Sequence, residues 1–196
     1  FQQQPSARFE VLPANSSRNM LTNGLFTTAT GGTVGTGNSG TLPSGVTGSR
    51  TGSAAATFSV EAASDGIGNQ IVADLTFSAA GEHVDLGMFP SVSGLVAGDV
   101  IQSGVEVEVS SSSDNFDGPT LRVNFNGNGH SMYDMQRTGL KGPTEAYTLV
   151  LQTPPTPVLA SPSLTSIGQY VQLWGSGAGS ATVKIRKAWT KRRIAS

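Results

Sequence analysis

The residues with the clearest chemical potential lie toward the end of the chain, in the stretch Tyr170-Val171-Gln172-Leu173-Trp174. Two aromatic rings and an amide alternate there with two aliphatic side chains. In an extended strand, Val171 and Leu173 would enter a core while Tyr170, Gln172 and Trp174 share the opposite face. Flat rings beside planar amides suit a sugar, which presents C–H groups above and below its ring and hydroxyls around it. We therefore expect a glycan-binding face on this strand.

Neighbouring segments contribute further polar side chains to the same expected face. Alternation in 100–109, 121–126 and 182–189 turns these side chains away from the core. They are Glu106, Glu108, Arg122, Asn124, Asn126, Lys184 and Arg186. If the strands lie beside one another, the face could hold a chain of sugars. The other interpretation is an ordinary polar outer sheet with an incidental Trp174.

A second candidate site is the glycine-containing turn from 126 to 137. His130, Tyr133 and Arg137 gather there at a predicted loop tip. Loops on rigid sandwiches often carry binding residues, so we add these three side chains to the candidate ligand-binding set.

Catalytic motifs are incomplete. Gly129-His130-Ser131 begins like the nucleophile elbow of a lipase, but Tyr133 stands where the strained turn needs a second glycine. Glu106 and Glu108 could be a carboxylate pair for glycoside hydrolysis, although the solvated face of one strand explains them more simply. The chain has no cysteine and so no thiol nucleophile or thiolate metal site. We predict a protein that is not an enzyme.

One segment resembles a calcium loop, because Asp114-Asn115-Phe116-Asp117-Gly118 combines close oxygen ligands with a turn glycine. A twelve-residue loop would begin at Ser113 and end at Asn124, and neither residue suits its position. We expect a turn rich in Asp and Asn, and no cofactor.

The elements that must position these residues are strands. The chain has 25 glycines in 196 residues and only 13% charged residues, and long helical apolar periodicity is missing. Alternating segments bounded by turn residues recur instead, at 57–61, 70–77, 83–89, 100–109, 121–126, 147–152, 166–174 and 182–189. About eight to ten such strands predict an all-β sandwich or barrel.

The chain divides into a short polar start and one domain. Residues 1–18, with a short alternating piece at 8–12, are predicted to be a linker or N-terminal extension, and residues 19–196 the domain. A strand interrupted by an Asn-Gly turn is expected over 19–26. Residues 29–56 hold many small residues and are expected to form a long surface loop, which would be functional or partner-bound.

The end of the chain is basic, since six of the twelve Lys and Arg residues lie in 184–193. Such a segment could bind an anionic polymer, but a solvated strand edge is the commoner explanation. No apolar run approaches the roughly 18 to 20 residues of a membrane helix. We expect neither nucleic acid nor membrane insertion.

Four motifs in order resemble a known family. They are Asn19-Met20-Leu21-Thr22-Asn23-Gly24-Leu25-Phe26, the turn Leu95-Val96-Ala97-Gly98-Asp99, Tyr147-Thr148-Leu149-Val150-Leu151, and Gly179 to Ile185. Their order is similar to that of jelly-roll carbohydrate-binding modules with the galactose-binding-like fold. The early stretch 42–50 is also similar to C-terminal domains of phage tail proteins and of phage-associated SGNH-type esterases.

The resemblance implies an all-β jelly-roll β-sandwich of two antiparallel sheets that binds cell-surface or matrix polysaccharide without catalysis. It would be a module of a larger phage or virus-like particle, or of an enzyme, at an extracellular or virion surface. The alternatives are a structural tail or spike domain that mediates assembly as a trimer or with other subunits, and an accessory domain of an esterase. Family modules place an acidic calcium ligand where this chain has Arg186-Lys187, so the resemblance does not extend to calcium.

Overall fold

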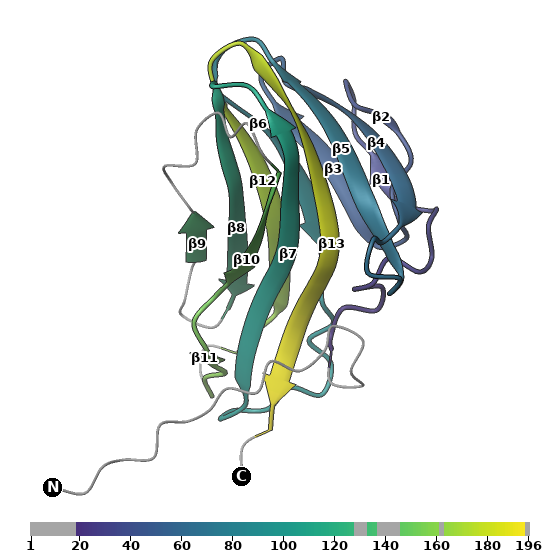
Figure 1. Cartoon of the computed structure of the whole chain (residues 1–196). Coiled ribbons are helices and arrows are strands. Elements are labelled where there is room, and N and C mark those ends of the chain that lie inside the picture. The colour runs from purple at the N-terminus through teal and green to yellow at the C-terminus, as the bar shows by residue number, and fades with distance from the viewer. Residues whose placement is uncertain (1–18, 128–132, 137–145, 161–162, 195–196) are drawn as a thin grey trace, which may run out of the picture.

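The computed structural model of the chain describes residues 19–127, 133–136, 146–160 and 163–194. Within these ranges the regular structure is all β, and no helix is long and apolar enough to cross a membrane. Two sheets pack face to face, with the long strands of one lying over those of the other (Figure 1). The predicted all-β sandwich is confirmed.

The first sheet has six strands in the order β1-β3-β6-β12-β8-β9. Their bounds are Thr33–Val34 for β1, Val46–Thr51 for β3, Ala80–Met88 for β6, Ser166–Ser176 for β12, Phe116–Asn126 for β8 and Tyr133–Gln136 for β9. Strand β12, which carries the predicted aromatic face, is central, between β6 and β8.

The second sheet has seven strands in the order β10-β7-β13-β5-β4-β2 with β11 also paired to β7. Their bounds are Tyr147–Gln152 for β10, Val100–Ser112 for β7, Gly179–Arg193 for β13, Asn69–Phe77 for β5, Ala55–Ala62 for β4, Ser39–Gly40 for β2 and Thr156–Pro157 for β11. Every pairing in the two sheets is antiparallel except the short parallel pairs β1–β3 and β2–β4.

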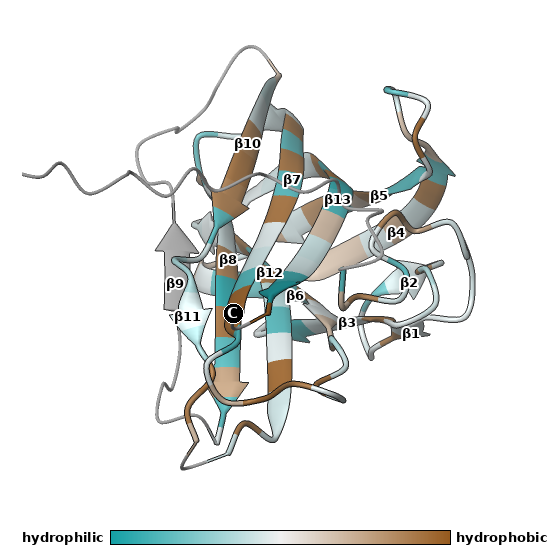
Figure 2. Ribbon diagram, turned by 90° about the horizontal axis from the view of Figure 1, so that it is seen from below, coloured by the Kyte–Doolittle hydropathy of each residue, from teal (hydrophilic) through white to brown (hydrophobic). Residues whose placement is uncertain are grey.

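The core lies between the sheets and follows the alternation of the strands. Val171 and Leu173 are fully buried, as are Val105, Val107 and Val109 of the facing sheet. Figure 2 shows the same alternation as hydrophobic and hydrophilic bands along β7. The eight alternating segments expected from the sequence all form strands, because a period of two is set by strand geometry itself.

Two expectations near the N-terminus are wrong. Over 19–26 the chain forms one isolated bridge, Asn19 with Lys191, followed by a turn rather than a strand. Residues 29–56 are not a single surface loop, because they contain β1, β2, β3 and the start of β4. The prediction failed because backbone hydrogen bonds between strands can form where the side chains are small and few are apolar. At Gly40 only glycine fits, since its φ is +95° and a Cβ would lie 1.9 Å from the Phe58 carbonyl oxygen.

The predicted linker falls outside the residues that the structure describes. It covers 1–18 and includes the expected strand at 8–12. The division at residue 19 stays a prediction.

A buried carboxylate ties two turns together beside the six-stranded sheet. Glu82 accepts hydrogen bonds from the backbone N–H groups of Ser53 (2.8 Å), Ser78 (2.7 Å) and Ala79 (3.2 Å), and from the Ser78 hydroxyl (2.9 Å). The Ser78 and Ser53 amides, foremost among these donors, hold the pKa of Glu82 at about 2, against an ordinary 4.5.

We therefore expect Glu82→Gln to lower the denaturation midpoint at neutral pH. A carboxyl with a depressed folded-state pKa stabilises fully above its ordinary value of 4.5, and this stabilisation is lost as the pH falls toward about 2. The difference between wild type and variant should thus shrink in acid, measured as urea midpoints across pH. If the difference in urea midpoint between wild type and Glu82→Gln stays constant down to acid pH, the ionised Glu82 carboxylate does not stabilise the fold. Glu61→Gln, at the surface beside Lys184, should have a smaller effect.

Candidate functional site

The outward side chains of β12 form rows with those of its two neighbours. Read from β6 across β12 to β8, the rows are His83–Trp174–Gly118, Asp85–Gln172–Thr120 and Gly87–Tyr170–Arg122. The exposed ring of Phe89 follows β6 directly and contacts Tyr170. We call this surface the outer face and define it by His83, Asp85, Phe89, Thr120, Arg122, Asn124, Tyr170, Gln172 and Trp174.

At one end of the outer face, Trp174 is held by an aromatic stack. Its ring lies 3.9 Å from that of His83, centroid to centroid, with 29° between the planes. The His83 Nε2 atom is 3.1 Å from the Thr51 hydroxyl and 3.4 Å from an Asp85 carboxylate oxygen. Because His83 is fixed on both sides, the Trp174 ring has a defined orientation before any ligand arrives.

In the middle of the outer face, Gln172 donates from Nε2 to the Asp85 carboxylate at 2.7 Å. This bond fixes which end of the amide is the donor, since an amide oxygen would be repelled by the carboxylate. The Oε1 atom of Gln172 is therefore the acceptor that remains.

Tyr170 lies over two glycines. A Cβ on Gly168 would approach the Tyr170 ring to 2.7 Å, and one on Gly87 would approach it to 3.2 Å. Phe89 contacts the same ring edge-on, with centroids 5.9 Å apart and planes at 89°. The missing side chains let the Tyr170 ring rest against the sheet, while Phe89 limits its movement sideways.

We expect Gly168→Ala to lower the affinity for a ligand of the outer face roughly fivefold, which is the value of one aromatic contact. The new methyl group would displace the Tyr170 ring without entering the core. The dissociation constant should rise as it does for Tyr170→Ala. If Tyr170→Ala weakens ligand binding but Gly168→Ala leaves the dissociation constant unchanged, the position of the Tyr170 ring does not matter for binding.

Four polar atoms of the outer face are buried without a hydrogen-bond partner in the described part of the chain. They are His83 Nδ1, Thr120 Oγ1, Asn124 Oδ1 and Gln172 Oε1. Gln172 and Thr120 are each only 4% exposed and oppose one another in register. Because native proteins pair nearly all such atoms with protein groups or ordered water, a cluster of them indicates a surface that takes up water or a polar ligand.

The expectation of one continuous polar face is wrong for four residues. Glu106 and Glu108 lie on β7, and Lys184 and Arg186 on β13, so all four belong to the opposite sheet. Alternation distinguishes the inside of a sandwich from the outside, but not one sheet from the other. The structure brings Tyr170, Gln172 and Trp174 together with Arg122 and Asn124, and with Asn126 at the edge.

On the opposite sheet the charges pair with one another. Arg186 contacts both Glu106 and Glu108, and Lys184 lies 3.1 Å from Glu61. Farther along β13, Lys187 contacts Asp65 and Arg192 contacts Asp99. The basic end of the sequence is thus largely one strand whose cations already have carboxylate partners. The expected strand edge is wrong, because β13 lies inside its sheet between β7 and β5.

Comparisons with known proteins identify the architecture. No family model matches the chain, and no curated protein matches it in sequence. Among solved structures, TmCBM61, determined in complex with β-1,4-galactotriose, has 16% identity and a TM-score of 0.52 over 90% of this chain and 100% of its own. The chain has a jelly-roll β-sandwich fold.

A phage protein shares this jelly roll. The enzymatically active domain of tailspike protein 4 of bacteriophage CBA120 has 14% identity and a TM-score of 0.51 over 90% of this chain. The chain spans only 22% of the length of that tailspike chain. A carbohydrate-binding module of the β-sandwich superfamily has 13% identity and a TM-score of 0.50, and the match covers 74% of this chain and 56% of the module.

Four residues of the outer face of the jelly roll were missed by the sequence reasoning, and one of them, Thr120, lies on β8 directly before the expected segment 121–126. His83, Asp85 and Phe89 lie on or directly after β6, in a segment where the alternation is weak. The signal that could have found them is that alternation, since His83 and Asp85 flank the buried Val84. Their pairing with Trp174 and Gln172 required the order of the strands.

The second candidate site falls mostly outside the described residues. His130 and Arg137 are not among them, and Tyr133 is placed only by its backbone in β9, where it pairs with Val123. The predicted binding role of these three residues stays a prediction.

The segment that resembled a calcium loop forms a turn. The Phe116 N–H donates to the Ser113 carbonyl, and the Asn115 amide donates to the Ala178 carbonyl at 2.8 Å. No cluster of three or more His, Asp or Glu residues that could hold a metal ion occurs in the described ranges. That no cofactor is required stays a prediction.

Proposed function

We propose that this jelly roll is a non-catalytic module that binds polysaccharide on its outer face. The observation that carries the proposal is the set of four buried, unpaired polar atoms beside the fixed rings of Tyr170 and Trp174. Rings supply apolar contact for the C–H faces of sugars. The polar atoms supply acceptors for hydroxyl groups.

The arrangement favours an extended ligand. Tyr170 and Trp174 are four residues apart on one strand, which corresponds to roughly 13 Å. This separation exceeds the size of one sugar ring, so one linked chain would be needed to contact both aromatic residues. Gln172 and Thr120 lie between the two rings and could accept hydroxyl protons there.

The chemistry of the free atoms favours a hydroxyl-rich ligand. Gln172 Oε1 and Asn124 Oδ1 are acceptors without a donor, and the carboxylate of Asp85 lies beside Gln172. The separate hydroxyl groups of a sugar chain can each donate to one of these acceptors, whereas a sulfate or phosphate brings only further acceptors. The opposite sheet also has buried polar atoms without a partner, among them Gln70 Oε1 and Tyr147 Oη, but its charges are paired with one another. The outer face is the better candidate because its unpaired polar atoms lie beside two oriented aromatic rings.

We further propose that the module delivers a larger phage or virus-like particle, or an enzyme, to a cell-surface or matrix polysaccharide, at an extracellular or virion surface. The shared fold of TmCBM61 and of the tailspike domain supports this setting. The alternative, favoured by the tailspike likeness alone, is a structural tail or spike domain that mediates oligomerisation. A trimeric mass in solution together with no glycan binding would support that alternative.

The test of the proposal is a screen of soluble polysaccharides by affinity electrophoresis and of insoluble ones by pull-down. Plant, bacterial-surface and animal-matrix polysaccharides should all be included. We expect at least one to retain the protein, and Val150→Ala, on the opposite sheet, to behave as wild type. Failure of every class to retain a folded protein would contradict polysaccharide binding.

A further inference from the structure

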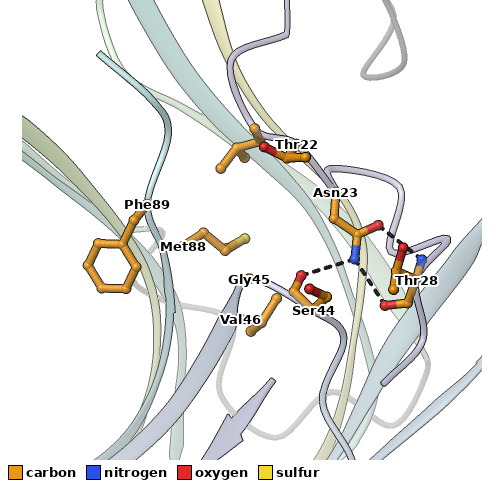
Figure 3. A pocket seen from close by; sticks show the side chains of 9 residues that line it. Thr22, Asn23, Thr28, Ser44, Gly45, Val46, Met88 and Phe89 are labelled. Atoms are coloured by element: carbon orange, nitrogen blue, oxygen red, sulfur yellow. Dashed lines mark hydrogen bonds between the residues drawn. The ribbon is translucent and has the colours of Figure 1, made fainter. Parts of the chain in front are cut away.

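A hollow lies next to the outer face, at the point where β6 ends and β3 begins. It is a cavity of about 310 Å³, a volume that small-ligand sites commonly have. Figure 3 shows Met88 and Phe89 on one side of the space and Asn23, Thr28 and Ser44 on the other. The lining residues are Leu21, Thr22, Asn23, Thr28, Ser44, Gly45, Val46, Met88 and Phe89. We call this space the β6-end pocket.

The far wall of the β6-end pocket is fixed by Asn23. Its amide group donates to the carbonyl oxygens of Thr28 and Ser44, both at 3.0 Å, and its oxygen accepts from the Thr28 N–H at 3.2 Å. Gly24 follows, and a Cβ there would lie 2.3 Å from the Ala188 carbonyl oxygen. The three hydrogen bonds of Asn23 therefore fix this wall, and the pocket exists before a ligand binds.

The conformation of the same segment is held under strain. Phe26 has a φ of +54°, which is rare for a bulky side chain, and its ring is almost fully buried. Asn69 donates to the Phe26 carbonyl at 2.9 Å and holds it there. Such strain persists only where the surroundings enforce it, and it is concentrated at ligand sites.

The residues that line the pocket are uncharged and fall into two groups, one apolar and one polar. Leu21, Val46 and Met88 are apolar and largely buried, while Thr22 and Ser44 contribute hydroxyl groups. None of the nine lining residues is acidic or basic. The pocket thus suits a neutral, amphipathic group and offers no counter-charge to a carboxylate or phosphate.

Phe89 connects the pocket to the outer face. Its side chain is 55% exposed, lines the pocket and contacts Tyr170 edge-on at 5.9 Å. A glycan that lies across Tyr170 would therefore reach the pocket with its next sugar or with a branch.

We propose that the β6-end pocket is a sugar subsite that selects a neutral sugar carrying an apolar substituent, either an N-acetyl group or the methyl group of a 6-deoxy sugar. The methyl group packs on Leu21, Val46 and Met88, while the hydroxyls of the sugar meet Thr22 and Ser44. The pocket can act alone on a monosaccharide. Its joint action with the outer face on one glycan rests on the proposed function.

Two matched pairs of monosaccharides test the selection by NMR of the full chain. N-acetylglucosamine is compared with glucose, and L-fucose with L-galactose, so that each pair differs only at the substituent. We expect the substituted member of at least one pair to shift the amide signals of Gly45 and Val46 with an affinity about fourfold higher, which is the value of burying one methyl group.

Phe89→Ala should weaken these shifts, because it removes a wall of the pocket that is not part of the core. Val150→Ala, an equally exposed apolar residue on the opposite sheet, should leave them unchanged. Equal responses to both members of each pair, or no response at Gly45 and Val46, would overturn the subsite. If a polysaccharide shifts the NMR signal of Trp174 but not those of Gly45 and Val46, the subsite proposal alone is wrong. If it shifts the signals of Gly45 and Val46 but not that of Trp174, only the proposal for the outer face is wrong.

Discussion

Replacing Trp174 with alanine is expected to weaken the binding of a retained polysaccharide at least tenfold. Tryptophan residues that anchor a ligand commonly contribute this much or more. Trp174 offers a ring oriented by its stack on His83, and alanine removes both the ring and the order it gives to His83. The measurement is the dissociation constant by calorimetry, with Trp174→Phe expected to retain part of the affinity.

The fold should survive this substitution, because Trp174 points away from the core that Val171 and Leu173 form. The loss of one stack should cost about 1 kcal/mol, or a few degrees in the melting temperature. Val150→Ala on the opposite sheet is the control for nonspecific effects. Unchanged affinity in a folded Trp174→Ala variant would show that the polysaccharide binds elsewhere.

Replacing Arg192 with alanine is expected to lower stability by roughly 3 kcal/mol, about 10 °C in melting temperature. The reason is Asp99, which is fully buried and whose carboxylate oxygen lies 2.8 Å from Arg192 Nε. The same carboxylate accepts a hydrogen bond from the Val96 N–H at 2.9 Å. This bond stabilises the turn that directly precedes β7. Without the guanidinium group, a buried charge loses its cationic partner.

Arg193→Ala is the matched control, since this neighbour is exposed at the end of β13. It should leave the melting temperature within about 1 °C, as exposed cations contribute little. If the two variants melt at the same temperature as wild type, the buried pair does not stabilise the turn. Both variants should bind polysaccharide as wild type does, because the residues lie on the opposite sheet.

The inside and outside of each strand could be predicted from the sequence. Val171 and Leu173 are buried, and Tyr170, Gln172 and Trp174 share a face, because every extended chain alternates. The sequence pattern does not indicate which strands lie next to one another in a sheet. Asp85 and Gln172 meet although 87 residues separate them, and this pairing decides which polar groups surround the rings.

The segment around Asn23 and Gly24 shows a second limit. An Asn-Gly pair between apolar residues usually predicts a hairpin. Here Gly24 is required because the chain passes close to the Ala188 carbonyl, and Asn23 is required to hold Ser44 and Thr28. Ala188 and Ser44 are distant in the sequence, so the local pattern predicted a strand where the structure has the wall of a pocket.

The central claim is that polysaccharide binds the outer face, and the two tryptophans of the chain test it most directly. Trp174 lies on the outer face, whereas Trp189 lies on the opposite sheet, where Lys191 covers its ring. Their indole N–H signals can be followed separately by NMR during titration with a polysaccharide fragment from the screen. The proposal predicts that the Trp174 signal shifts and saturates while the Trp189 signal does not move. A shift of Trp189 with Trp174 unmoved would contradict it.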